Sequence, residues 1–216
     1  MLKSNKHVFW EALLVTAGLF VIGIFLGMLI ETGHSSQISN LYLNSEINLV
    51  DGMATSRLLD SQNIDCETLK KGNIEFADKV YEEGKLLDEY ESAGKLIENL
   101  NLLHRKYDLL RTMLWISSQN SLERCDNYDL IVYLYEFETE ETVKKATQNV
   151  WSKILLDAKR ENEDILLIPI AADQNLTSLN ILIAEHNVTK FPAVIINNDE
   201  IIYTLENANQ IQSLLN

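Results

Sequence analysis

The run Asp129-Leu130-Ile131-Val132-Tyr133-Leu134-Tyr135 decides the fold of the C-terminal part of this chain. It is continuously β-prone, without the alternation of polar and apolar residues that a half-exposed strand shows, so it predicts a strand buried on both faces. Buried strands of this kind belong to sheets covered by helices. We therefore expect strands and helices to alternate along the residues that follow.

The residues after Tyr135 carry this alternation. The predicted elements are helix Glu141–Arg160, strand Asp164–Ala171, helix Leu176–His186, hairpin strands Ala193–Asn197 and Glu200–Thr204, and helix Asn207–Leu215. Pro169 indicates an end, an edge or a bulge of its strand, because proline has no amide donor. Asn207 is a suitable N-cap for the last helix.

The helix predicted over Glu141–Arg160 has one apolar face, which we expect to pack on the sheet. The residues of this face are Val143, Ala146, Val150, Ile154 and Ala158. Thr139 is the expected N-cap, with Glu140 and Glu141 against the positive end of the helix dipole.

The order β-α-β-α-β-β-α over residues 128–216 resembles the thioredoxin-like superfamily. The most specific local match is Asn187-Val188-Thr189-Lys190-Phe191-Pro192-Ala193-Val194-Ile195-Ile196. In that family a helix ends, a valine-centred loop follows, and a cis-proline introduces the first strand of the hairpin. Pro192 stands at that place, so the resemblance implies a cis bond between Phe191 and Pro192.

The sequence departs from this family at the motif that carries its chemistry. Thioredoxins hold Cys-x-x-Cys where the first strand runs into its helix, and Thr139-Glu140-Glu141-Thr142 occupies that place here. Thiol–disulfide exchange needs a thiolate, which a threonine hydroxyl does not replace. We therefore expect no catalytic residue, no cofactor and no oxidoreductase activity in this part of the chain.

The resemblance also implies a binding surface. In redox-active relatives, the backbone beside the cis-proline pairs with an extended peptide. The corresponding residues here are Lys190, Phe191 and Pro192, flanked by Thr139 and Thr142. Phe191 is either an exposed anchor for a peptide or a residue packed beneath the turn, and the sequence leaves both open.

Near the N-terminus, Ala12 to Ile30 form an unbroken apolar run. As a helix this run spans about 28 Å, close to the hydrocarbon core of a bilayer, which makes the lipid bilayer a partner of residues 12–30. Lys3 and Lys6 precede the run and no basic residue follows before Arg57, which predicts a cytoplasmic N-terminus over residues 1–11 and an external remainder. A cleavable signal peptide is the alternative, but the run is long and lacks a small-residue cleavage site.

Gly23 and Gly27 form a Gly-x-x-x-Gly pair inside this run. Such a pair allows two membrane helices to approach closely, which favours a homodimer. The alternative is that glycine is simply common in membrane helices.

The chain has 18 basic and 32 acidic residues and a formal net charge of −14. This charge repels nucleic acid and anionic lipid headgroups, so we expect neither as a partner; the protein or peptide partner that we expect follows from the resemblance. The four histidines are scattered, and no Cys/His/Asp cluster has the spacing of a metal site.

Two apolar series between the membrane segment and the sheet predict an antiparallel helical hairpin that turns at Gly94. The first series is Leu69, Phe76, Val80, Leu87 and Tyr90, and the second is Leu100, Leu103, Tyr107, Leu110 and Leu114. Cys66 and Cys125 are almost equidistant from the turn, so both sulfurs reach the open end of the hairpin and we expect a disulfide. A redox-active pair and two buried free thiols are the alternatives.

Residues 35–60 predict a further helix with irregular apolar spacing, and Asp65 is the expected cap of the helix that follows. Residues 35–125 are therefore expected to form either a three-helix unit or a hairpin held off the membrane on a stalk. A coiled-coil partner is a further use of the apolar seam.

Asn175-Leu176-Thr177 and Asn187-Val188-Thr189 are glycosylation sequons if the domain is external, although such tripeptides also occur by chance. Taken together, the sequence predicts an α+β chain of several parts: a transmembrane helix over 12–30, a helical hairpin or stalk over 35–125, and a thioredoxin-like α/β domain over 128–216. The predicted function is non-catalytic: a membrane-anchored, extracytoplasmic module of the cell envelope that binds proteins or peptides or serves as a scaffold. The alternative is an accessory role in extracytoplasmic thiol–disulfide chemistry.

Overall fold

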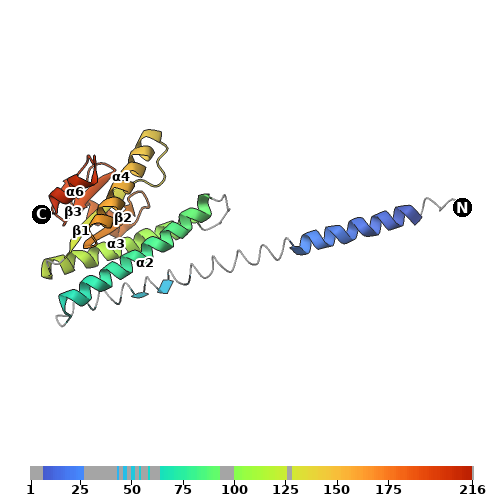
Figure 1. Cartoon of the computed structure of the whole chain (residues 1–216), viewed down its shortest axis with the longest axis horizontal. Helices are drawn as coiled ribbons and strands as arrows, with labels where there is room; N and C mark the ends of the chain where they lie inside the picture. Colours follow the sequence, from blue (N-terminus) through green and yellow to red (C-terminus); the bar gives the residue numbers. More distant parts are fainter. Residues whose placement is uncertain are drawn as a thin grey trace. The chain divides into compact units, whose positions relative to one another are not determined.

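The computed structural model describes residues 7–26, 43, 46–47, 50–51, 54, 58, 64–92, 100–125 and 128–215. The chain forms two compact units, residues 1–44 and residues 45–216. Figure 1 colours both units along the sequence, from blue at the N-terminus to red at the C-terminus.

The first unit contains a helix from His7 to Leu26 with a mean hydropathy of 2.2. By length and composition alone, this helix is long and apolar enough to cross a membrane. Residues 27–30 of the predicted span, Gly27 among them, lie outside the described residues. A Cβ on Gly23 would have no neighbour within 4 Å.

The second unit contains a four-stranded sheet with the strand order β2-β1-β3-β4. Its elements after the hairpin are β1 (Asp129–Tyr135), α4 (Thr142–Glu161), β2 (Ile165–Ala171), α5 (Thr177–Glu185), β3 (Ala193–Ile196), β4 (Glu200–Ile202) and α6 (Ala208–Leu214). β1 runs parallel to β2 and antiparallel to β3, and the Phe191–Pro192 bond is cis. The order of elements and the cis bond are those that the thioredoxin-like resemblance implied, so the prediction of the fold is confirmed at this level.

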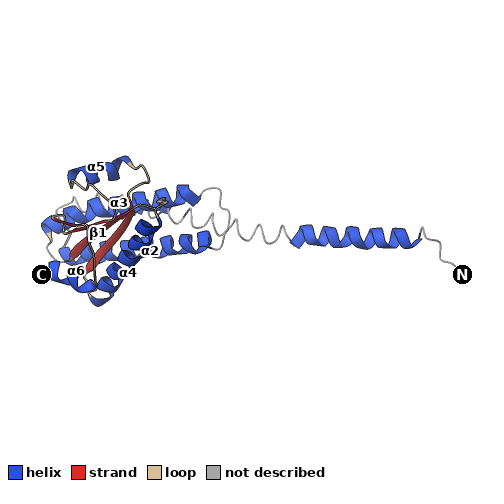
Figure 2. Cartoon of the chain, turned by 90° about the horizontal axis from the view of Figure 1, so that it is seen from above, coloured by secondary structure: helices blue, strands red, loops and turns tan. Residues whose placement is uncertain are grey.

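Helices cover both faces of the sheet, as the burial of β1 requires. Leu130, Ile131, Val132 and Leu134 are all 0% exposed. In Figure 2, β1 lies between α3 and α5 on one side and α4 and α6 on the other. The side chains of β1 alternate between two core clusters, one on each face.

Helix α4 packs on the sheet through a face that matches the predicted one only in part: Ala158 is 0% exposed and Ile154 packs against the core, as predicted, but the other three residues are exposed. Val143 is 80% exposed and Val150 is 55% exposed, and Ala146 is exposed as well. The buried residues are Gln148, Trp151, Leu155 and Ala158. The predicted and the buried residues both recur at helical spacing. The large side chains of Trp151 and Leu155 fill the core and so decide which face is buried.

The helical hairpin consists of α2 (Cys66–Ser92) and α3 (Leu100–Arg124). Its predicted seam is confirmed for Val80, Leu103, Tyr107 and Leu110, which form one buried cluster. The turn at Gly94 and the side chains of Leu87 and Tyr90 lie outside what the structure describes.

The hairpin does not stand apart from the sheet as the predicted stalk would. Leu114 and Trp115 of α3 and Ala77 of α2 are buried in the same cluster as the β1 side chains. A salt bridge from Lys70 to Asp164 joins α2 to the start of β2, and one from Lys159 to Asp78 joins α4 to α2. The hairpin is therefore a layer of the α/β unit, because α3 has a second buried surface besides its seam with α2. Of the helix predicted over residues 35–60, only positions 43, 46–47, 50–51, 54 and 58 are described, and these are helical.

The predicted caps are confirmed at two helices and wrong at a third. Asp65 Oδ1 accepts a hydrogen bond from the Thr68 amide at 2.9 Å, and Asn207 Oδ1 accepts one from the Gln210 amide at 3.1 Å. Thr139 does not cap α4, because the helix begins at Thr142 with Glu141 in the N-cap position.

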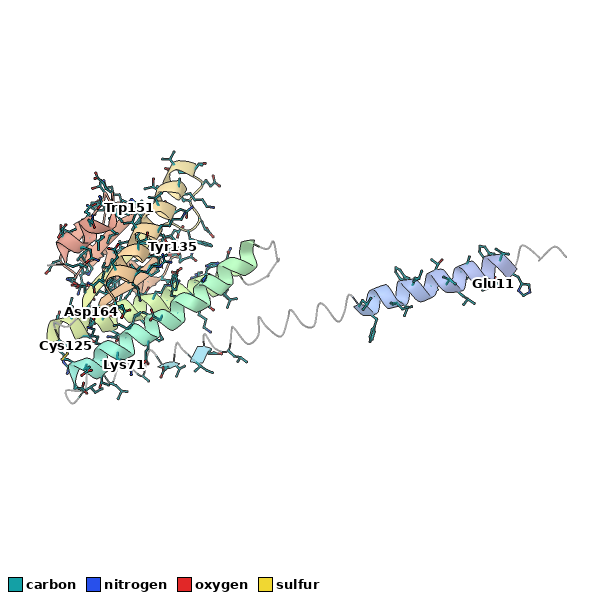
Figure 3. All side chains as sticks on the ribbon, viewed as in Figure 1. Glu11, Lys71, Cys125, Tyr135, Trp151 and Asp164 are labelled. Atoms are coloured by element: carbon teal, nitrogen blue, oxygen red, sulfur yellow. A yellow bond between two sulfur atoms is a disulfide. The ribbon has the colours of Figure 1, made fainter. Side chains whose placement is uncertain are left out.

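Cys66 and Cys125 form a disulfide with their Cα atoms 5.4 Å apart, as the hairpin spacing predicted. Figure 3 shows Cys125 near one end of β1 and Tyr135 at the other, so the disulfide lies far from the end of the sheet at which the chain passes into α4. Cys125 is 4% exposed and packs with Leu69, which is 5% exposed.

Replacement of both cysteines by serine should lower the free energy of unfolding by up to about 4 kcal/mol, because the disulfide closes a long loop in the unfolded chain. Urea unfolding followed by circular dichroism measures this loss. Reductant should lower the midpoint of the wild type and leave that of the Cys66→Ser/Cys125→Ser variant unchanged. Equal midpoints for the oxidised wild type and the variant would contradict the stabilising role.

Candidate functional site

The candidate site lies at the end of the sheet where β1 leads into α4. In open α/β sheets, ligands bind beyond the carboxyl ends of the parallel strands. The register pairs Leu134 of β1 with Ala193 of β3. The loop after Tyr135 and the Lys190–Pro192 segment before Ala193 therefore lie at this same end.

The loop that follows β1 is held by hydrogen bonds from two side chains. The carboxylate of Asp173 accepts from the amides of Phe137 at 3.0 Å and Glu138 at 2.7 Å. The buried amide of Gln148 accepts from the Glu136 amide at 2.8 Å and donates to the Glu136 carbonyl at 2.9 Å. The backbone of residues 136–138 is thus fixed from both β2 and α4.

Helix α3 contributes a third set of contacts to this end of the sheet. The ring centroids of His104 and Phe137 are 4.3 Å apart, and Arg105 Nε donates to the carbonyl of Gln174 at 3.2 Å. The loops after both parallel strands are therefore tied to one turn of α3.

Asp108, one turn further along α3, is a buried carboxylate that is 2% exposed. Its Oδ1 accepts from the Ala171 amide at 3.1 Å and from Arg111 Nη1 at 3.2 Å. Burial raises the pKa of Asp108, while the Arg111 guanidinium and the Ala171 amide oppose this by favouring the charged form. A Cβ on Gly84 of α2 would lie 2.7 Å from Arg111 Nη2, so glycine leaves room for the guanidinium.

The Arg111→Met variant should lose about 3–5 kcal/mol of stability at neutral pH, because it leaves the Asp108 carboxylate buried without its cation. Removal of Arg111 takes away an influence that lowers the pKa, so the folded-state pKa of Asp108 rises further above its ordinary value of about 3.9. Stability then falls as the pH rises from that ordinary value, and the deficit should be smaller at about pH 5 than at about pH 7.5. Urea unfolding of the variant and the wild type at both pH values measures this difference in the free energy of unfolding.

The Asp108→Asn/Arg111→Met double variant is the matched control for this prediction. Because it carries neither charge, it should be more stable than Arg111→Met at about pH 7.5, and the titration of Asp108 should no longer contribute to the pH dependence of its stability. A pH-independent deficit in Arg111→Met would show that the loss comes from packing rather than from the buried charge.

The residues predicted to bind a peptide divide into exposed and packed ones. Lys190 is exposed, with its Nζ 4.9 Å from the centroid of the Tyr203 ring, and the Thr189 amide donates to the Tyr203 hydroxyl at 3.2 Å. Phe191 is half-buried and packs against the core cluster that contains β1 and α3, which favours the interpretation that it packs beneath the turn.

The predicted peptide surface consists of Lys190–Pro192 on one side and Thr139 and Thr142 on the other. Both parts lie at the same end of the sheet, but no polar or ring contact joins them in the described part of the chain. Thr142 is exposed and Thr139 is half-exposed. Within the described residues, no hydrogen bond, ion pair or ring contact connects either threonine to Lys190, Phe191 or Pro192.

A cleft of about 850 Å³ lies on the other side of the end of β1, toward β2. Aromatic residues of β1 and the following loop line it together with one side of α4, Pro169 of β2 and Asn101 of α3. Sequence reasoning did not identify this cleft, because its walls come from four elements that are far apart in the chain.

The two sequons lie at the two ends of α5. Asn175 and Asn187 are both exposed and have φ values of 53° and 55°.

Within the described residues, no group of three or more His, Cys, Asp or Glu side chains is arranged to hold a metal ion.

Comparisons with known proteins add little to this geometry. No family model and no curated protein matches the chain. A solved structure of thioredoxin O2 from Arabidopsis thaliana in the oxidised state is similar to it at 14% identity, over 47% of this chain and 84% of that chain, with a TM-score of 0.35. A likeness this distant carries no argument, so the description of the fold rests on the strand order and the cis bond.

Several residues that shape the site were missed from the sequence. Asp173 follows a buried strand directly, a position from which a polar side chain reaches the end of the sheet, and this signal was available. Gln148 and Asp108 lie on helices among charged neighbours, and nothing in their sequence context separates them from surface residues.

Proposed function

We propose that this chain is a membrane-anchored, redox-inactive protein of the cell envelope that binds extended segments of partner proteins beside its cis-proline. Two features at one end of the sheet carry the proposal: the cis peptide bond and the lack of cysteine after β1. The cis bond of the thioredoxin-like arrangement is present at Phe191–Pro192, while the segment between β1 and α4 carries no cysteine.

The position of Lys190 supports peptide binding. Its side chain is exposed and directly precedes the half-exposed Phe191–Pro192 pair, so an extended chain has access to the backbone here. Backbone pairing gives affinity, and neighbouring side chains give selectivity. At the same end of the sheet, where α4 begins, Val143 is 80% exposed and offers an apolar contact, and Thr142 is exposed beside it.

The apolar N-terminal helix supports the anchor, and the distribution of basic residues supports an external location for the second unit. Protease added to sealed right-side-out vesicles should remove most of the polypeptide. Resistance until the vesicles are permeabilised would contradict this orientation.

The alternative, a role in external thiol chemistry, rests on Cys66 and Cys125 alone. Both are joined in the disulfide, and Cys125 is buried. We expect the protein to leave the rate of insulin reduction by dithiothreitol unchanged, because the end of the sheet offers no thiolate. Turbidity with and without the full-length protein measures this rate, and any acceleration would contradict redox inactivity.

A photo-reactive amino acid at position 190 should capture discrete partner proteins in intact cells, because the peptide surface surrounds Lys190. The matched control is the same amino acid at position 153, where an exposed lysine lies on α4. Crosslinked products are identified by mass spectrometry. Identical products from both positions, or none from position 190, would contradict a binding surface beside the cis-proline. Phe191→Ala is less suitable as a test, because Phe191 also packs against the core.

A further inference from the structure

We infer that Asn175 is the acceptor of an N-linked oligosaccharide in the folded protein, and that Asn187, in the second sequon, is not. The inference rests on one part of the proposed function, the external location of the second unit, because asparagine is glycosylated outside the cytoplasm. It depends neither on redox inactivity nor on peptide binding. Both sequons consist of asparagine, an aliphatic residue and threonine, so any difference between them comes from the fold.

Both acceptor asparagines are accessible from solvent. They lie just before and just after α5, which Figure 2 shows on the outside of the second unit, and Ile181 of α5 is 62% exposed. The side chains of Asn175 and Thr177 are exposed. Those of Asn187 and Thr189 are exposed as well. Exposure therefore does not decide between the two sites.

Hydrogen bonds hold the second sequon in its folded conformation. The backbone amides of Asn187 and Val188 donate to carbonyls of α5 at 3.1 and 3.0 Å. The Thr189 amide donates to the Tyr203 hydroxyl at 3.2 Å. The side-chain amide of Asn187, the group that would receive the sugar, donates to the Glu185 carbonyl at 3.4 Å. A transferase can therefore take this tripeptide in another conformation only after the loop has opened.

The first sequon is free of such contacts. Within the residues that the structure describes, neither the side chains of Asn175 and Thr177 nor the backbone amides of residues 175–177 make a hydrogen bond. The asparagine amide and the threonine hydroxyl define the acceptor tripeptide, so both are available at this site. The residue before it is anchored, because Gln174 is 7% exposed and its carbonyl accepts from Arg105 Nε at 3.2 Å. The sequon thus projects from a fixed point with its own polar groups unused.

The sugar comes from a membrane lipid, an oligosaccharide linked to a polyprenyl phosphate or diphosphate, and a separate transferase catalyses the step. A bond forms between Asn175 Nδ2 and the anomeric carbon of the first sugar, while the bond from that carbon to the lipid phosphate oxygen breaks. The lipid phosphate leaves with the electron pair, and the asparagine amide loses one proton. An anchor in the same membrane, as the proposed function has it, raises the effective concentration of the acceptor near this donor.

The test uses the full-length protein purified from membranes of the organism that produces it. A protease that cuts after glutamate separates the two sequons, because residues 164–185 form one peptide and residues 186–200 form the next. Mass spectrometry should find the first peptide heavier by the mass of an oligosaccharide and the second at its polypeptide mass. Asn175→Gln should abolish this mass shift, and Thr177→Ala should abolish it while keeping the asparagine.

The matched control is Asn187→Gln, which should leave the oligosaccharide on the 164–185 peptide unchanged. Two outcomes would overturn the inference: the 164–185 peptide has its polypeptide mass, or both peptides carry the oligosaccharide. Protease treatment of sealed vesicles separates this failure from that of the proposed function. If protease removes the second unit while Asn175 is unmodified, the external location stands and the inference about the glycan is wrong.

Discussion

The buried carboxylate of Asp108 is the interaction on which the arrangement of this unit depends. It accepts the amide at the end of β2 and the guanidinium of Arg111, and that guanidinium occupies space left by Gly84 of α2. One charge therefore connects the sheet, α3 and α2. Because a buried charge without partners is costly, α3 is held in one position along the end of β2. The contacts one turn earlier, from Arg105 and His104 to the loops after the parallel strands, depend on that position.

The position of the hairpin also closes one edge of the sheet. In a parallel pair, successive amides point alternately toward and away from the partner strand. Residues 165, 167, 169 and 171 share the outer edge of β2, and at three of these four positions no amide is left for a new strand: the Ile165 amide donates to Asn162, the Ala171 amide donates to Asp108, and Pro169 has no amide. Such an edge offers little to another strand. Recognition of a partner is therefore more favourable at the end of the sheet than along β2.

The sequence predicted the elements of the sheet well because their signals are local. The apolar run of β1 predicts a buried strand by itself, whereas the cis bond at Pro192 was implied by the resemblance of residues 187–196 to the thioredoxin-like superfamily. The packing of α3 on the sheet was not predictable in this way. Its second buried surface includes Thr112 and Ser118, both 0% exposed, whose hydroxyls donate to carbonyls four residues earlier at 2.6 and 2.7 Å. Buried threonine and serine residues whose hydroxyls donate to carbonyls of their own helix cannot be distinguished from surface residues in a sequence. The buried face of α4 was predicted correctly at Ile154 and Ala158 and wrongly at Val143 and Val150, because apolar residues recur at helical spacing on two overlapping faces and only the core decides between them.

The loop of residues 136–138, which leads from β1 into the Thr139–Thr142 segment, is fixed rather than free. Four hydrogen bonds from Asp173 and Gln148 hold the backbone of residues 136–138, and His104 stacks with the ring of Phe137. A loop ordered before binding loses little conformational entropy when a ligand arrives, which favours recognition. The same loop forms a wall of the cleft and leads into the exposed start of α4. This end of the sheet therefore positions a ligand through backbone geometry and neighbouring side chains, which is the kind of recognition that the proposed function requires.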